Sequence, residues 1–151
     1  MTTILLNTEI SAPIKRCFDM ARSIDLHQRS SANTNERAID GVRSGLIGLN
    51  QTVTWRAKHF GITQTLTVKI TEFSSPFYFK DVMLRGAFRK MEHLHFFEEN
   101  NNGTIMRDQF DFEAPFGFLG RLIETFFLTA YLKKFLLARN EFIKSMAESD
   151  K

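Results

Sequence analysis

The chain has 151 residues, a size typical of one domain that buries its core without disulfides. Its 20 basic and 17 acidic residues give a formal net charge of +3, and they are scattered, which argues against nucleic-acid binding. Cys17 is the only cysteine, which excludes an internal disulfide and a cysteine-based zinc site. The first ten residues lack a signal-peptide pattern, and the longest apolar stretch, Leu122 to Leu132, is too short to span a bilayer. We therefore expect one cytoplasmic domain over residues 1–151.

Phenylalanine is over-represented, with 16 residues against one tryptophan and two tyrosines. A phenyl ring adds apolar area without a hydrogen-bonding group, so the surplus indicates extensive apolar walls. These walls could enclose a cavity. The plain alternative is a phenylalanine-rich core with no cavity.

The first third of the chain predicts one strand and two short helices. Residues 4–10 read as a strand. Ser11 is placed to cap a helix that has Pro13 in its first turn. A second short helix is expected after Ser23, followed by a polar loop over residues 30–35.

From residue 36 onward, short segments of alternating hydrophobicity are separated by glycine, proline and asparagine. Short connections between such segments are typical of an antiparallel meander. Six strands are predicted, over residues 36–40, 50–60, 63–73, 77–84, 87–98 and 104–113.

After Pro115 the apolar residues recur at spacings of three, four and seven, which predicts one long helix over about residues 118–147. Basic residues in its second half, Arg139 among them, are expected on a solvated face. Some apolar residues lie off the main stripe and need a cover. The two short helices are the simplest cover, and a dimer interface or a membrane surface are the alternatives. The off-stripe residues are Phe127, Leu128, Tyr131 and Leu132.

The order of elements predicts an α+β fold in which a curved antiparallel sheet of about seven strands wraps around the long C-terminal helix. The two short helices would close one end. A cavity remains between sheet and helix if the sheet curves more than close packing requires.

Alternate positions of the last three strands carry histidines and aspartates among aromatic residues. Burying a polar group without a partner costs about 1–3 kcal/mol, so an ordinary core would omit these groups, whereas a small-molecule cavity uses them to orient a ligand. The predicted face comprises Phe77, Phe79, Asp81, Met83, His93, His95, Phe97, Met106, Asp108, Phe110 and Phe112.

The turn over residues 100–103 sets the pairing of the last two strands. With a four-residue connection His95 lies opposite Asp108, and the two could hydrogen-bond because cross-strand Cβ atoms are about 4.5–5.5 Å apart. Asp81 could meet His93 from the preceding strand. An ionised aspartate raises the pKa of a neighbouring histidine and desolvation lowers it, so the sequence leaves the sign of the shift open.

Three roles are open for these two histidines and two aspartates. They could form a satisfied polar cluster, they could orient a carbonyl or hydroxyl group of a ligand, or His95 could act as a general acid/base whose tautomer Asp108 fixes. Two histidines at i, i+2 with one aspartate are a weak metal signal, so neither a metal nor another cofactor is predicted. Trp55 is either a core residue or a pocket wall.

Several residue runs resemble the START-like superfamily, also called SRPBCC, over nearly the whole chain. The resemblance implies a helix-grip fold and a small, stand-alone bacterial member of the cyclase/dehydrase-like or cell-division-associated kind. It does not choose among carriers, enzymes and proteins without a ligand, and no catalytic signature of the aromatase/cyclases can be carried over by position. The runs are Glu36 to Gly41, Gln51 to Gly61, Phe79-x-Asp81-x-Met83-x-x-Gly86-x-Phe88, His93-x-His95-x-Phe97, and the alternating segment from Thr104 to Gly120.

We expect a binding module for a hydrophobic small molecule, either a lipid or an aromatic, polyketide-like compound. The alternatives are a cyclase/dehydratase-type enzyme that uses the same cavity and an interaction protein related to cell division or stress. A homodimer is possible, and a nucleic-acid partner is not expected. The residues expected to contact the ligand are Trp55, Phe79, Asp81, His93, His95, Phe97, Asp108, Phe110, Phe112 and Phe126.

Overall fold

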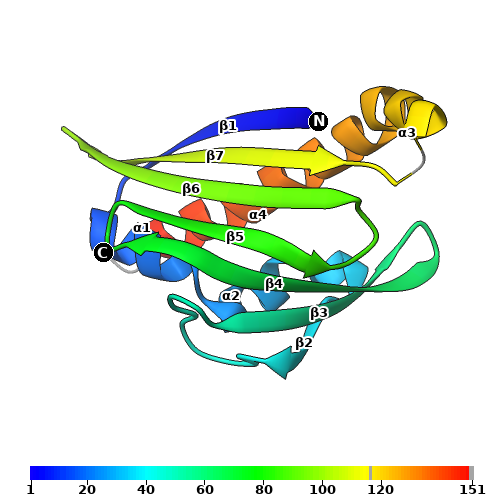
Figure 1. The fold of residues 1–151 in the computed structure, drawn as a ribbon. Helices are drawn as coiled ribbons and strands as arrows, with labels where there is room; N and C mark the ends of the chain where they lie inside the picture. Colours follow the sequence, from blue (N-terminus) through cyan, green and yellow to red (C-terminus); the bar gives the residue numbers. More distant parts are fainter. Residues whose placement is uncertain (116, 150–151) are drawn as a thin grey trace.

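One antiparallel sheet of seven strands forms the larger layer of the protein, whose computed structural model describes residues 1–115 and 117–149. Neighbouring strands follow the order β1-β7-β6-β5-β4-β3-β2, so the first and last strands pair at one edge. Figure 1 shows the sheet curving around the C-terminal helix. The strands are β1 (Thr2–Ile10), β2 (Arg37–Gly41), β3 (Thr52–His59), β4 (Ile62–Ser74), β5 (Tyr78–Arg85), β6 (Lys90–Asn100) and β7 (Gly103–Glu113).

Helices lie on one side of this sheet. Two short helices connect β1 to β2, and the last helix crosses the same side, where it contacts β1 and both short helices. No helix among the described residues is long and apolar enough to cross a membrane. The helical segments are α1 (Ile14–Ala21), α2 (Ile24–Ser30), the 3-10 turn η1 (Ala32–Thr34), α3 (Gly117–Ile123), the π-helical turn η2 (Glu124–Leu128) and α4 (Thr129–Ser149).

The predicted α+β architecture is confirmed, with differences at the ends of elements. Strand β5 begins at Tyr78, because the N–H of Phe77 donates to the carbonyl of Ser74 in a tight turn (2.8 Å). Phe77 is 56% exposed and is therefore not part of the buried face, contrary to the prediction.

The start of α1 also differs from the prediction. Pro13 is the N-cap residue and supplies no side-chain hydrogen bond. Ser11 lies two residues earlier, and its backbone N–H donates to the carboxylate of Glu148 (2.9 Å). For α2 the predicted cap is confirmed, since the Ser23 hydroxyl accepts from the N–H of Leu26 (3.1 Å).

The predicted long helix covers the expected residues but is not uniform. The π-helical turn η2 interrupts it, and the preceding α3 makes its main contacts with η2. Figure 1 shows α3 beyond the ends of β1 and β7, whereas α4 lies against the sheet. Of the C-terminal helical segments, α4 is the one that the short helices mainly contact. The expectation that they bury Phe127 is wrong, because Phe127 is 71% exposed. Leu128 and Leu132 do pack against the core.

Phe18 of α1 fills the centre of the core between the helices and the sheet. Its ring is fully buried and meets Phe73, Phe79 and Phe97 edge-on, with ring centroids 5.3–5.6 Å apart. Edge-to-face contact of this kind adds to the free energy gained from burial. At this end of the molecule, therefore, the protein's own rings fill the space between sheet and helix.

We predict that Phe18→Ala destabilises the fold by about 3–5 kcal/mol, because the lost ring leaves a cavity that neighbouring rings fill only in part. Urea unfolding measures this loss. Phe96→Ala is the matched control: Phe96 is 38% exposed and contacts only Tyr78 among the described rings, so its loss should be under about 1.5 kcal/mol. Equal losses for the two variants would contradict this description of the core.

Candidate functional site

The register between β6 and β7 places two histidines and an aspartate on the buried face of the sheet. His95 pairs with Asp108 across the strands, as the four-residue turn predicted. The turn closes tightly against β1, because a Cβ atom on Gly103 would lie 2.2 Å from the carbonyl oxygen of Ile10. This close approach helps to fix the register that brings the polar side chains together.

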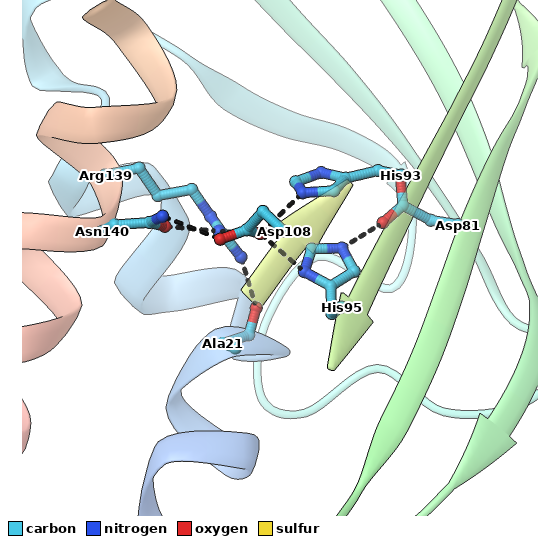
Figure 2. A network of polar contacts seen from close by, with 7 residues as sticks. All are labelled: Ala21, Asp81, His93, His95, Asp108, Arg139 and Asn140. Atoms are coloured by element: carbon cyan, nitrogen blue, oxygen red, sulfur yellow. Dashed lines mark hydrogen bonds and ion pairs between the residues drawn. The ribbon is translucent and has the colours of Figure 1, made fainter. Parts of the chain in front are cut away.

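The hydrogen bonds run diagonally across the strands instead of directly (Figure 2). His93 Nε2 lies 2.8 Å from Asp108 Oδ1, and His95 Nε2 lies 2.8 Å from Asp81 Oδ2. His95 Nδ1 is 3.5 Å from Asp108 Oδ1. The two imidazoles stack with centroids 3.7 Å apart. In this arrangement His93 bonds to Asp108 and His95 bonds to Asp81, the reverse of the predicted pairs. The four predicted residues therefore meet, but with exchanged partners.

Two residues of α4 complete this cluster, and the sequence analysis did not find them. The Asn140 amide donates to Asp108 Oδ2 (2.7 Å), and Arg139 Nη1 lies 3.5 Å from Asp108 Oδ1. Arg139 also donates to the carbonyl of Ala21 (3.2 Å). The assignment of Arg139 to a solvated face is wrong, because only 5% of it is exposed. The sequence did contain a signal for its burial, because Arg139 lies at helical spacing from apolar residues. The buried residues of α4 are Leu136, Arg139, Asn140, Ile143 and Ala147.

Both carboxylates of the cluster are ionised. Burial alone would raise the pKa of Asp108, but the hydrogen bond from His93, the close contact with His95 and the positive charge of Arg139 bring it well below its ordinary value. Burial likewise opposes ionisation of Asp81, but its hydrogen bond with His95 lowers its pKa overall. The cluster is thus built around stabilised negative charge.

His93 is neutral near pH 7. Burial, followed by the adjacent His95, lowers the pKa of His93 from 6.5 to about 4, although the hydrogen bond to Asp108 acts in the opposite direction. Desolvation therefore decides the direction of the His93 pKa shift, which the sequence left open. A neutral imidazole that bonds a carboxylate must carry its proton on the bonded nitrogen, which makes Nε2 of His93 the donor.

Asp81, His93 and His95 bring possible ligand atoms within 4.8 Å of one another, as a metal site would require. The lone pair of an imidazole nitrogen lies in the plane of its ring. Because the rings of His93 and His95 stack with only 30° between their planes, their lone pairs run nearly side by side and do not converge on one point. As arranged, these residues do not fit a metal ion.

The cluster is also poorly placed for acid/base chemistry on a substrate. The side chains of His93 and Asp108 are 8% and 1% exposed, and their hydrogen-bonding atoms face each other or α4. Among the described side chains of the cluster, His95 Nδ1 is the buried polar atom left without a hydrogen bond. Proton exchange within the cluster is possible, but a substrate would first have to displace residues of the core.

The aromatic residues expected as pocket walls lie at three places. Phe79 stacks on His95 (4.1 Å between centroids) and, with Phe97, surrounds Phe18. Trp55 is 7% exposed and lies against the ring of His27. Phe110 and Phe112 pack with Phe88, and Phe110 also meets the ring of His93 edge-on (5.2 Å between centroids). Phe126 joins none of them: it is 68% exposed on η2, because this part of the helix leaves the sheet.

A recess of about 460 Å³ lies where α3 meets the ends of β1 and β7. Arg89 Nη1 is 3.6 Å from the carboxylate of Glu113 at its edge. Phe112, in the ring cluster beside Phe88 and Phe110, pairs in register with Thr2 and directly precedes two lining residues, so that cluster lies next to the recess. The lining residues are Met1, Thr2, Arg89, Glu113, Ala114, Gly117, Phe118 and Arg121.

The fold resembles solved structures at low sequence identity. The protein TTHA0849 from Thermus thermophilus has a TM-score of 0.74 at 13% identity, over 97% of this chain and 99% of that one. A major latex-like protein from Panax ginseng has a TM-score of 0.70 at 12% identity, over 97% of each chain. The Aha1 dimer from Colwellia psychrerythraea has a TM-score of 0.70 at 15% identity, over 100% and 99%. No protein-family model and no curated protein matches the sequence.

The chain has the helix-grip fold that its sequence resemblance implied, with a curved antiparallel sheet around a long C-terminal helix. Likeness at this level of identity establishes the fold alone.

We predict that Asp108→Asn destabilises the protein by about 3–5 kcal/mol, because it removes the negative charge opposite buried Arg139 and sets an amide N–H against a donor. Chemical denaturation measures the difference. Asp111→Asn is the matched control on the same strand. In the described part of the chain Asp111 accepts from the neutral groups of Thr3 and Gln109, so its loss should be about 1 kcal/mol. A similar loss in both variants would mean that the charge of Asp108 does not support the fold.

We predict that acid weakens the fold through His93. The unfolded chain binds a proton at this residue below pH 6.5, whereas the folded protein does so only near its folded pKa of about 4. The contribution of neutral His93 to the free energy of unfolding is therefore complete above about pH 6.5. It falls by about 3 kcal/mol as the pH drops to 4. Unfolding free energies measured at several pH values should follow this slope, and His93→Gln should flatten it. An unchanged slope in His93→Gln would assign the acid sensitivity to other groups.

Proposed function

We propose that this protein binds a hydrophobic small molecule carrying a polar or anionic group, at the α3 end of the interface between sheet and helix. The observation that carries the proposal is the recess of about 460 Å³ between α3 and the ends of β1 and β7. This volume is within the range of small-molecule sites, about 300–1,000 Å³.

The lining of the recess supports a ligand with two chemical parts. Arg89 and Arg121 place guanidinium groups at it, and each can donate two parallel hydrogen bonds to a carboxylate or phosphate. Phe118, Ala114 and Met1 supply apolar surface at the recess. A fatty acid or a similar amphiphile would place its head at the arginines and its chain against Phe118, Ala114 and Met1.

The START-like resemblance adds a general reason, because that superfamily includes lipid-transfer domains and other carriers. The predicted contribution of the His–Asp cluster remains part of this proposal in a reduced form. Neutral His93 carries its proton on Nε2, which leaves its Nδ1 as an acceptor for a polar group of a deeply bound ligand. His93 Nε2, His95 Nε2 and both oxygens of Asp108 are already bonded within the sheet or to α4, so the cluster supports the wall of the site more than it contacts a ligand.

The proposal is tested first on the protein as purified. Mass spectrometry under non-denaturing conditions should reveal a bound apolar molecule after gentle purification, and solvent extraction should release it. The second test is titration with a dansyl-labelled fatty acid, which should bind to the protein after extraction. Absence of both a co-purified molecule and dansyl fatty-acid binding would contradict the proposal.

We predict that Arg89→Gln/Arg121→Gln weakens dansyl fatty-acid binding by about tenfold or more, because two charge-assisted contacts to the carboxylate are lost. Fluorescence titration measures the dissociation constants. Arg37→Gln/Arg43→Gln is the matched control, since both arginines are exposed and lie on and just after β2, away from the recess. Equal weakening by the two double variants would indicate a general charge effect and would place the site elsewhere.

A further inference from the structure

Beyond any small-molecule ligand, the structure has an apolar surface at one end that nothing in the described chain covers. We define the end surface as the exposed large apolar residues of the β3–β4 turn, α3 and η2. Their exposed fractions run from 46% to 79%. The residues are Phe60, Ile62, Phe118, Leu119, Leu122, Phe126 and Phe127.

The two segments that form this surface are joined by direct contacts. The Tyr131 hydroxyl at the start of α4 lies 2.6 Å from His59 Nδ1, and the Tyr131 ring lies 4.5 Å from that of Phe60. Figure 1 shows the β3–β4 turn and α3 at the same end of the molecule. The apolar residues therefore face outward from one end and are not scattered over the protein.

The backbone of Phe60 adopts a left-handed conformation, which is unfavourable for a bulky residue. Phe60 and Gly61 form the turn between β3 and β4, with φ angles of 55° and 74°. Asparagine adopts the left-handed conformation readily in such a turn, whereas a bulky ring is an outlier there. Phe60 is also 62% exposed, so core packing does not explain its presence. A strained, exposed aromatic residue indicates that the ring serves a partner outside the chain.

The charges around the end surface identify that partner. Residues 58–62 and 117–134 contain four basic residues and one acidic residue, Glu124. The basic ones, Lys58, Arg121, Lys133 and Lys134, are all exposed. Aromatic and aliphatic side chains with basic residues around them fit the interface of an anionic bilayer, where rings enter the headgroup region and cations meet lipid phosphates. A second copy of the chain would bring the same positive charges together.

We propose that the end surface docks the protein reversibly on an anionic lipid bilayer, with Phe60, Phe126 and Phe127 entering the interface and the lysines on the headgroups. Docking would also bring the opening of the recess close to the lipid. The contact does not depend on a ligand in the recess, so it can be tested separately from the proposed function.

Vesicle sedimentation tests the proposal, with phosphatidylcholine vesicles that contain about one quarter phosphatidylglycerol. The protein should sediment with these vesicles at low salt and dissociate from them at high salt. It should not bind vesicles of phosphatidylcholine alone. Phe126→Ser/Phe127→Ser should lower the partition coefficient by about tenfold or more, and Lys133→Glu/Lys134→Glu by at least as much. The controls Leu5→Ser and Arg43→Glu change exposed residues elsewhere and should stay within about twofold of the unmodified protein.

Phe60→Asn separates a docking role from a structural one. It places a residue suited to the left-handed turn at this position but removes the ring contact with Tyr131, so the melting temperature should change little. Vesicle binding should nevertheless fall several-fold, because one interfacial ring is lost. Equal binding to neutral and anionic vesicles, or unchanged binding in Phe60→Asn and Phe126→Ser/Phe127→Ser, would overturn the proposal. So would a dimer in light scattering that Phe126→Ser/Phe127→Ser converts to monomers, because a second copy would then cover the end surface.

Discussion

The buried carboxylate of Asp108 is the interaction on which the rest of the arrangement depends. It receives hydrogen bonds from β6 and α4, through His93 and Asn140, and lies close to the guanidinium of Arg139. An ionised group in the interior is tolerated only when such partners surround it. The geometry that satisfies Asp108 therefore also fixes where α4 lies on the sheet. Arg139 also connects α4 to α1, because it donates a hydrogen bond to the carbonyl of Ala21.

Because these contacts hold only α4, the C-terminal helix has two parts with different surroundings. The second part is held by the polar cluster and by a buried stripe that continues to Ala147. The first part, α3 and the π-helical turn η2, has no comparable attachment among the described residues and leaves Phe118 and Phe126 exposed. Packing is dense around Phe18 and open around α3, so a ligand or a membrane is accommodated most readily at the α3 end. Both proposals follow from this asymmetry.

The sequence predicted the architecture and the register because both depend on local patterns. Alternation identified the strands, and the length of the turn before Gly103 placed His95 opposite Asp108. The hydrogen-bond partners were not predictable in this way, because the stacking of the imidazoles decides them. Arg139 was misplaced because charge was given more weight than its helical spacing from Ile143. Phe126 was misplaced because a uniform helical period cannot reveal that the helix leaves the sheet at η2.

Amide hydrogen exchange tests the central claim most directly, because it measures the attachment of each part of the helix separately. The account predicts slow exchange in α4 around residues 136–147 and fast exchange in α3 and η2 in the protein alone. Addition of a fatty acid or anionic vesicles should slow exchange in α3 and η2 and leave α4 unchanged. Equal protection of the two parts in the protein alone, or no response of α3 to either addition, would contradict the account.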